Sequence, residues 1–195
     1  VSVGYLPENI KLYDNLTGKE TLDFFADVRN VDKDEKDELL AKVDLMDAAD
    51  RKVGEYSKGM LQRLAFAQSL LGDPSFLILD EPTSGLDPEG TALVKDVVRE
   101  YAEKGGTVFF SSHILPNVQE VADRVGIITK GELRAIDTVD NLKDKLELPS
   151  ELSLVISKNV KEILPVLDRT EFIQNFHGKG NKLTVSCESK DKIKV

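Results

Sequence analysis

The stretch Phe76-Leu-Ile-Leu-Asp-Glu-Pro-Thr83 places a short apolar run directly before two adjacent acids. A continuous apolar run of this length is typical of a strand that is buried on both faces of a parallel sheet. Asp80 and Glu81 stand at the carboxyl end of this strand, where open α/β folds bind ligands. The stretch therefore predicts an α/β fold with a polar site at one edge of its sheet.

The downstream sequence repeats the alternation of short apolar runs with helical patterns. Strands are expected at residues 107–110 and 125–129, and helices at residues 88–104 and 116–123. Such alternation predicts parallel strands that are joined by helices covering the sheet. The Lys130-Gly131 pair predicts a turn into an edge strand at residues 133–136, and Thr138 is a candidate cap for a short helix to residue 146.

An all-helical insert separates a first strand, at residues 1–6, from the apolar run that begins at Phe76. Thr17 and Glu20 fit a capping box at the start of a helix that is expected to end near Arg29. Further helices are expected at residues 32–48 and 58–71, where apolar residues recur at helical spacing. We therefore expect a partial core, residues 1–13 and 73–148, and a helical subdomain, residues 14–72.

The sequence beyond Pro149 is expected to form a small α+β annex. Its pattern predicts strands at residues 152–156, 172–176 and 183–186, a helix at residues 160–167 and a turn at Gly178-Lys-Gly180. Residues 149–195 are too few to bury a complete core of their own, so we expect only part of a domain here.

Asp80 and Glu81 are candidates for two different tasks. Adjacent residues on a strand point to opposite sides, so the two carboxylates cannot perform the same function. One can hold Mg²⁺ together with nucleotide phosphates, and the other can orient and deprotonate an attacking water. Taken alone, the Asp-Glu pair is more often two solvated acids at the end of a strand than a catalytic pair.

Three more short motifs surround this acidic pair: Tyr56-Ser-Lys-Gly-Met60, Pro82-Thr-Ser-Gly-Leu-Asp87 and Ser111-Ser-His113. In this order they resemble the signature loop, the aspartate loop and the switch histidine of ATP-binding cassette (ABC) ATPases. The resemblance implies a P-loop NTPase-like parallel sheet with a helical subdomain. It also implies that the protein is the ATP-binding and ATP-hydrolysing subunit of an ABC membrane transporter, most similar to those of exporters.

The same resemblance implies roles for the acidic pair and the histidine. Asp80 is expected to hold Mg²⁺ and Glu81 to act as the general base. His113 is expected to contact the γ-phosphate of ATP and to position the attacking water, and an imidazole can serve there near neutral pH. Without this context, a lone histidine after a strand is more often structural.

Ser57, Lys58 and Gly59 are expected to bind phosphate. Because Ser57 stands where a helix begins, its hydroxyl and the following amides would face an anion with the helix dipole behind them. In the family this loop meets ATP that a second cassette holds, so the resemblance implies a homodimer with sandwiched ATP. The loop departs from the usual Leu-Ser-Gly-Gly-Gln at Tyr56, Lys58 and Met60, and a plain capping role for Ser57 is compatible with the pattern.

Asp87 and Glu8 are assigned to the nucleotide site by resemblance alone. Asp87 belongs to the aspartate loop. Glu8, in Tyr5-Leu-Pro-Glu8, stands where the family usually has glutamine. An ionised carboxylate can still contact the metal, although it cannot donate a hydrogen bond to water. In the family, this loop and the helical insert receive the coupling helix of a transmembrane permease subunit.

The chain contains no Gly-x4-Gly-Lys-Ser/Thr phosphate-binding loop. Its closest approach, residues 54–61, lacks the lysine and hydroxyl positions and belongs to the signature loop. The family places the true loop before the first loop seen here, so we interpret the sequence as lacking an upstream segment. This chain alone is therefore expected to bind ATP weakly or not at all and not to hydrolyse it.

Composition excludes some classes of function. A net charge of −9 argues against a nucleic acid partner, which requires a basic surface. The single cysteine, Cys187, suits a reducing compartment, and no apolar run approaches the roughly 20 residues of a membrane span. We expect a cytoplasmic protein that lies at the inner face of the membrane through its membrane subunits.

Two alternatives remain open from the sequence. A soluble, non-transport ABC ATPase usually carries long arms or a second cassette, and the short stretch between Glu8 and Ser57 leaves no room for arms. A non-catalytic interaction module would not need Asp80, Glu81 and His113, although it could describe this chain by itself. The transported substrate cannot be inferred, because specificity belongs to the membrane subunit.

Overall fold

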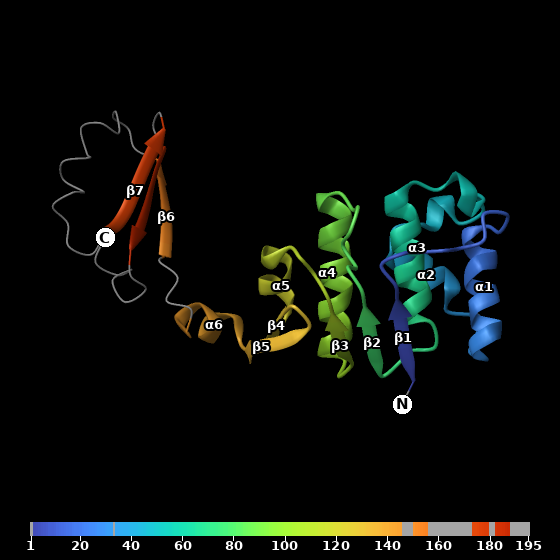
Figure 1. Cartoon of the computed structure of the whole chain (residues 1–195). Helices are drawn as coiled ribbons and strands as arrows, with labels where there is room; N and C mark the ends of the chain where they lie inside the picture. Colours follow the sequence, from blue (N-terminus) through green and yellow to red (C-terminus); the bar gives the residue numbers. More distant parts are fainter. Residues whose placement is uncertain (1, 33, 146–149, 156–172, 180–181, 188–195) are drawn as a thin grey trace. The chain divides into compact units, whose positions relative to one another are not determined.

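The computed structural model describes residues 2–32, 34–145, 150–155, 173–179 and 182–187 (Figure 1). Its contacts divide the chain into two compact units, Val1–Val121 and Ala122–Val195. Among the described residues, no helix is long and apolar enough to cross a membrane.

A parallel sheet forms the centre of the first unit. Its strands are β1 (Val3–Leu6), β2 (Phe76–Leu79) and β3 (Thr107–Phe110), in the order β1-β2-β3. The register pairs Leu6 with Leu79 and Leu79 with Phe110, so the three strands end at the same edge. The predicted parallel α/β architecture is confirmed.

Helices cover one face of this sheet. Helices α3 (Lys58–Leu70) and α4 (Pro88–Glu103) lie on the same side of the strands (Figure 1). The side chains of Leu6, Leu77 and Leu79 point toward them and are at most 1% exposed. Burial of an aliphatic side chain of this size contributes about 1.5–3 kcal/mol, so this layer is a main source of stability.

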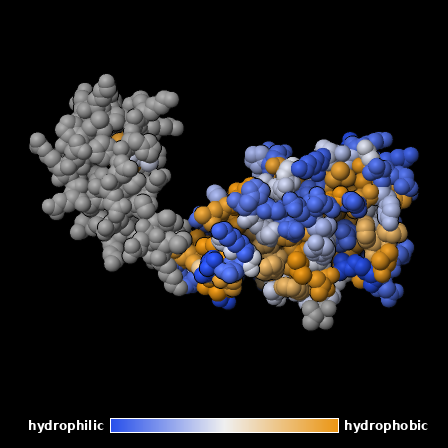
Figure 2. All heavy atoms as spheres, in the orientation of Figure 1, coloured by the Kyte–Doolittle hydropathy of each residue, from blue (hydrophilic) through white to orange (hydrophobic). Residues whose placement is uncertain are grey.

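The opposite face of the sheet is open, and the expectation that its strands are buried on both faces is wrong. Val3, Tyr5 and Phe109 are 45%, 52% and 64% exposed. Figure 2 shows hydrophobic surface over these strands. The physical reason is the alternation of side chains along a strand, since only every second residue faces α3 and α4.

The helical part begins with α1 (Gly18–Arg29), and its predicted capping box is confirmed. The backbone N–H of Thr17 donates to Glu20 Oε2 at 2.8 Å, and the N–H of Glu20 donates to Thr17 Oγ1 at 3.2 Å. Two of the amides that lack partners at a helix start are thereby satisfied.

The second predicted helix is shorter than expected. Helix α2 spans Lys36–Lys42, and a separate 3₁₀ turn, η1, spans Met46–Ala48. Asp44 adopts a left-handed conformation (φ 53°), which ends the helix. Arg63 stabilises this break because its guanidinium donates to the carbonyls of Val43 and Asp44. A second 3₁₀ turn, η2 (Val53–Glu55), leads toward α3.

Helix α5 (Leu115–Val121) ends the first unit, and a hairpin opens the second. Strand β4 (Val125–Thr129) pairs antiparallel with β5 (Glu132–Asp137). Both turn residues, Lys130 and Gly131, have positive φ, as a two-residue hairpin turn requires. The hairpin is confirmed, but β4 belongs to this two-stranded sheet and not to the parallel sheet, and its Ile128 is 68% exposed.

The rest of the second unit contains α6 (Val139–Lys145) and an antiparallel sheet. The predicted cap of α6 is confirmed, because Thr138 Oγ1 accepts from the Asn141 amide at 3.2 Å. Strands β6 (Ser150–Val155), β7 (Ile173–Lys179) and β8 (Lys182–Cys187) have the order β6-β8-β7. Gly178 lies within β7 and pairs with Leu183, outside the turn assigned to it, and the predicted helix at residues 160–167 lies outside the described residues.

Candidate functional site

The candidate site lies at the carboxyl edge of the parallel sheet. The Asp80 amide donates to the Leu6 carbonyl at 2.8 Å, and the Ser111 amide donates to the Leu79 carbonyl at 3.0 Å. The segments that leave β1, β2 and β3 therefore start side by side. They carry Glu8, the Asp80-Glu81 pair and His113, respectively.

Ser111 joins the two acidic residues. Its hydroxyl donates to Asp80 Oδ1 at 2.6 Å and accepts from the backbone N–H of Glu81 at 3.0 Å. Sequence reasoning assigned only the histidine of the Ser111-Ser-His113 motif. The signal was present, because a small hydroxyl residue that follows a strand next to the acidic strand end is placed to reach it.

The backbone of Glu81 is left-handed, with φ of 50°. This conformation costs a non-glycine residue about 1–2 kcal/mol, so contacts from the surrounding structure must hold it. Its N–H is held by Ser111, and its carbonyl accepts from the Ser84 amide at 3.0 Å and from Gln62 Nε2 at 3.2 Å. The contact from Gln62 is a second feature that the sequence did not reveal, since nothing marks one glutamine within a helical pattern.

Glu81 and His113, the two predicted catalytic residues, are brought together. Glu81 Oε1 lies 2.9 Å from His113 Nδ1. The Glu81 side chain is 16% exposed, whereas that of His113 is 73% exposed. The other carboxylate oxygen, Oε2, is buried and has no hydrogen-bond partner among the described residues. One carboxylate oxygen of Glu81 is therefore a buried acceptor that no described residue satisfies.

The donor set at this edge fits Mg²⁺, which prefers oxygen ligands and keeps several waters or phosphate oxygens. In the part of the chain that the structure describes, no three His, Cys, Asp or Glu side chains form a group that could hold a metal by themselves. Asp80 follows β2 and Glu8 lies exposed in the loop after β1, so each could contribute an oxygen. Phosphate and water would complete such a shell.

The signature loop starts α3 as the sequence predicted. Ser57 is the N-cap, and its Oγ accepts from the Met60 amide at 3.2 Å. Ser57 and Lys58 are exposed, and Gly59 is half-buried. The Lys58 stem lies against Gly85, where an added Cβ would be 2.8 Å from Lys58 Cε. Because Gly85 also has φ of 72°, a side chain there would be disfavoured on both counts.

Tyr56 anchors the start of this loop. Its hydroxyl donates to the Ala48 carbonyl at 2.7 Å, and Arg51 lies 5.7 Å from its ring centroid. Burial raises the pKa of Tyr56, although the nearby Arg51 opposes this effect. The phenol therefore remains a hydrogen-bond donor at neutral pH, and the substitution at this signature position has a structural role.

Asp87 acts in the structure as the N-cap of α4. Its Oδ1 accepts from the Gly90 amide at 2.8 Å, and Pro88 occupies the first helical position. The capping role alone explains why an aspartate occupies this position, without a bound ligand. Its contact with nucleotide stays a prediction, as do the ligand roles of Glu8, Ser57, Lys58 and Gly59.

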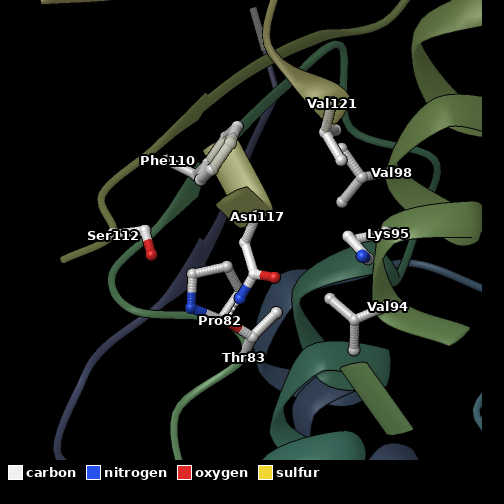
Figure 3. Close-up of a pocket in the computed structure, with 9 residues that line it drawn as sticks. All are labelled: Pro82, Thr83, Val94, Lys95, Val98, Phe110, Ser112, Asn117 and Val121. Atoms are coloured by element: carbon white, nitrogen blue, oxygen red, sulfur yellow. Dashed lines mark hydrogen bonds between the residues drawn. The ribbon is translucent and has the colours of Figure 1, made fainter. Parts of the chain in front are cut away.

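A small cavity lies behind the loop that follows β2 (Figure 3). Figure 3 shows Asn117 reaching from α5 to Thr83, whose Oγ1 accepts from Asn117 Nδ2 at 3.3 Å. The remaining walls are mainly apolar, with Val94, Val98 and Phe110 among them. With a volume of about 20 Å³, the cavity has room for about one water. A cavity of this size cannot hold a nucleotide.

The fold defines an α/β domain with the P-loop NTPase architecture, and comparisons with known proteins agree. A family model described as ABC transporter matches residues 1–84. A solved structure described as an ATP binding subunit of an ABC transporter has a TM-score of 0.68 and 28% sequence identity. The similarity covers 74% of this chain and 62% of that one.

Two relatives show the extent of the similarity. An uncharacterized ABC transporter ATP-binding protein of Bacillus subtilis is 47% identical over 136 residues, which cover 69% of this chain and 44% of that protein. A fluoroquinolones export ATP-binding protein of Mycobacterium tuberculosis is 44% identical over 131 residues, which cover 67% of this chain and 44% of that protein. The chain spans about half or less of the length of such curated relatives.

The chain belongs to the family of ABC transporter ATP-binding proteins. Proteins of this family bind ATP, generally with Mg²⁺, and hydrolyse it. They generally dimerise and work with membrane permease partners.

Proposed function

We propose that the whole protein to which this chain belongs is the ATP-hydrolysing subunit of an ABC exporter, with Glu81 as general base. The observation that supports this best is the Glu81 carboxylate. One oxygen is held by His113 at 2.9 Å, while the other is buried and free of partners among the described residues. A base needs such an oriented, available oxygen to take a proton from water.

Asp80 and Glu8 hold Mg²⁺ in this proposal, and His113 orients Glu81 and contacts the γ-phosphate. When bound, Mg²⁺ bridges and partly neutralises the phosphate oxygens. Ser111 keeps Asp80 and Glu81 in their relative positions through its two hydrogen bonds. Each acid thus has a separate task in this proposal.

Two cassettes sandwich ATP in the proposed assembly. Ser57, Lys58 and Gly59 bind the phosphates of ATP that the second cassette holds, and Asp87 contributes from the neighbouring loop. The exposure of Ser57 and Lys58 at the start of α3 supports a role toward an external ligand. Permease subunits would then keep the protein at the inner face of the membrane.

Export is the proposed direction of transport. Its support is the 44% identity to a protein named for fluoroquinolones export. The 195-residue chain by itself is proposed to be inactive, because it contains no sequence that matches the phosphate-binding loop.

The test is Glu81→Gln in the whole protein. The amide keeps the size of the side chain but cannot accept a proton at that oxygen, so turnover should fall at least about 100-fold. ATP binding should stay within about twofold, because the change removes no phosphate contact. Glu89→Gln, an exposed acid in the first turn of α4, is the matched control and should leave turnover unchanged. Normal turnover in Glu81→Gln would refute Glu81 as the base.

A further inference from the structure

The buried side chain of Gln62 contacts the loop that follows β2. It lies on α3 and is 3% exposed. Its Nε2 lies 3.2 Å from the Glu81 carbonyl and 3.2 Å from the Pro82 carbonyl. Because a side-chain amide has two N–H groups, both carbonyls can be satisfied by the one nitrogen.

These contacts act where the loop is strained. The left-handed backbone of Glu81 must be held by surrounding contacts: the Glu81 and Pro82 carbonyls accept from Gln62, and the Glu81 N–H donates to Ser111. The direction of the Glu81 side chain depends on this backbone conformation. A shift of about 1 Å in a reacting group can cost a factor of about 100 in rate, so the hold affects chemistry and not only stability.

We infer that Gln62 is a positioning residue for Glu81 and that it links the base to the signature loop. Ser57 caps the same helix. The first turn of α3 therefore carries the loop that is proposed to meet ATP of the second cassette, and Gln62 follows shortly after on the same helix. A rigid helix passes a displacement of its first turn to Gln62, and Gln62 passes it to the Glu81 and Pro82 peptides. This inference rests on the proposed role of Glu81.

A merely structural glutamine would give a different pattern. Loss of its hydrogen bonds would then lower the stability of the fold, and the rate per folded molecule would stay the same. A positioning role instead lowers kcat while KM for ATP and the folded fraction remain near their original values. The two roles are thus distinguished by the split between kcat and KM.

The first measurement is amide hydrogen exchange by NMR on the 195-residue chain with Gln62→Met. Methionine fills a similar volume without donors. We expect the Glu81 and Ser84 amides, which bond to Ser111 Oγ and the Glu81 carbonyl, to exchange about tenfold faster. The Asp80 amide, which bonds to the Leu6 carbonyl, should not change. Unchanged exchange at Glu81 and Ser84 would overturn the inference whatever the ATPase activity is.

The second measurement is steady-state ATPase activity of the whole protein. Gln62→Met should lower kcat about tenfold or more with KM for ATP within about twofold. Gln62→Glu should lower kcat further, because a carboxylate would face two carbonyl oxygens. Gln68→Met on the same helix is the matched control and should keep the original kcat. An unaltered kcat in Gln62→Met would refute the positioning role, whereas an active Glu81→Gln would refute the proposed base instead.

Discussion

Ser111 connects the two acidic residues of the candidate site. Its hydroxyl bonds both Asp80 and the Glu81 backbone, and Glu81 adopts a conformation that few non-glycine residues take. The hydroxyl therefore contributes both to stability and to the conformation of Glu81.

Ser111→Ala should destabilise the 195-residue chain by about 1–2 kcal/mol, because one hydrogen bond to a carboxylate and one to a backbone amide are lost. Urea denaturation measures this change. Ser112→Ala is the matched control, since Ser112 Oγ accepts only the local Ile114 amide among the contacts described. Its effect should be clearly smaller, and equal effects of the two substitutions would contradict the role of Ser111.

At the residue scale, the sequence predicted what depends on neighbours along the chain. The capping hydroxyls of Thr17 and Ser57 bond amides three residues ahead, and such short-range patterns are legible in the sequence. The left-handed Glu81 was not predictable, because Gln62 and Ser111 hold it from distant parts of the chain. A tertiary contact of this kind leaves no local pattern.

Helices α2 and α4 are joined by an ion cluster around Glu100. Its Oε1 lies 2.6 Å from Lys104 Nζ and 3.3 Å from Lys42 Nζ. The hydrogen bond from Lys104, followed by that from Lys42, holds the pKa of Glu100 below its usual value of 4.5. The cluster thus links the helical part to the helix that covers the sheet.

The depressed pKa of Glu100 contributes to the dependence of stability on pH. A carboxyl group whose folded pKa is lowered stabilises the fold above its unfolded pKa, and this contribution is lost as pH falls through the folded pKa. Glu100→Gln should therefore melt at a lower temperature at neutral pH and show a smaller loss of melting temperature below pH 4.5. Glu103→Gln, an exposed acid on the same helix, serves as control. Identical pH profiles for Glu100→Gln and the original chain would contradict this assignment.

The presence of a helix or strand was easier to predict than its length or the strand with which it pairs. Strands β2 and β3 span the residues predicted for them, because three or four consecutive apolar residues leave little ambiguity. Helix α2 ended early because Arg63 binds the carbonyls at the break, which is a tertiary contact. Strand β4 was assigned to the wrong sheet, since an apolar run does not specify its partner.

The 195-residue chain combines the candidate site at the sheet edge with no phosphate-binding loop in its sequence. The exposed start of α3 is the remaining proposed phosphate contact, and in the proposed assembly it serves the second cassette. Calorimetric titration of this chain with Mg-ATP should therefore show no binding at micromolar concentrations. A micromolar Kd would contradict the proposal, and the whole protein provides the positive control.

The open face of the parallel sheet has a practical consequence for spectroscopy. The chain contains no tryptophan, and Phe109 projects from this face on the outer strand β3 with 64% of its surface exposed. An indole introduced at Phe109 would be the sole one in the chain and would disturb none of the buried layer below. Its emission would lie at long wavelength while water covers the face and would move to shorter wavelength when another apolar surface replaces that water, so a single fluorophore would report the solvation of the whole face.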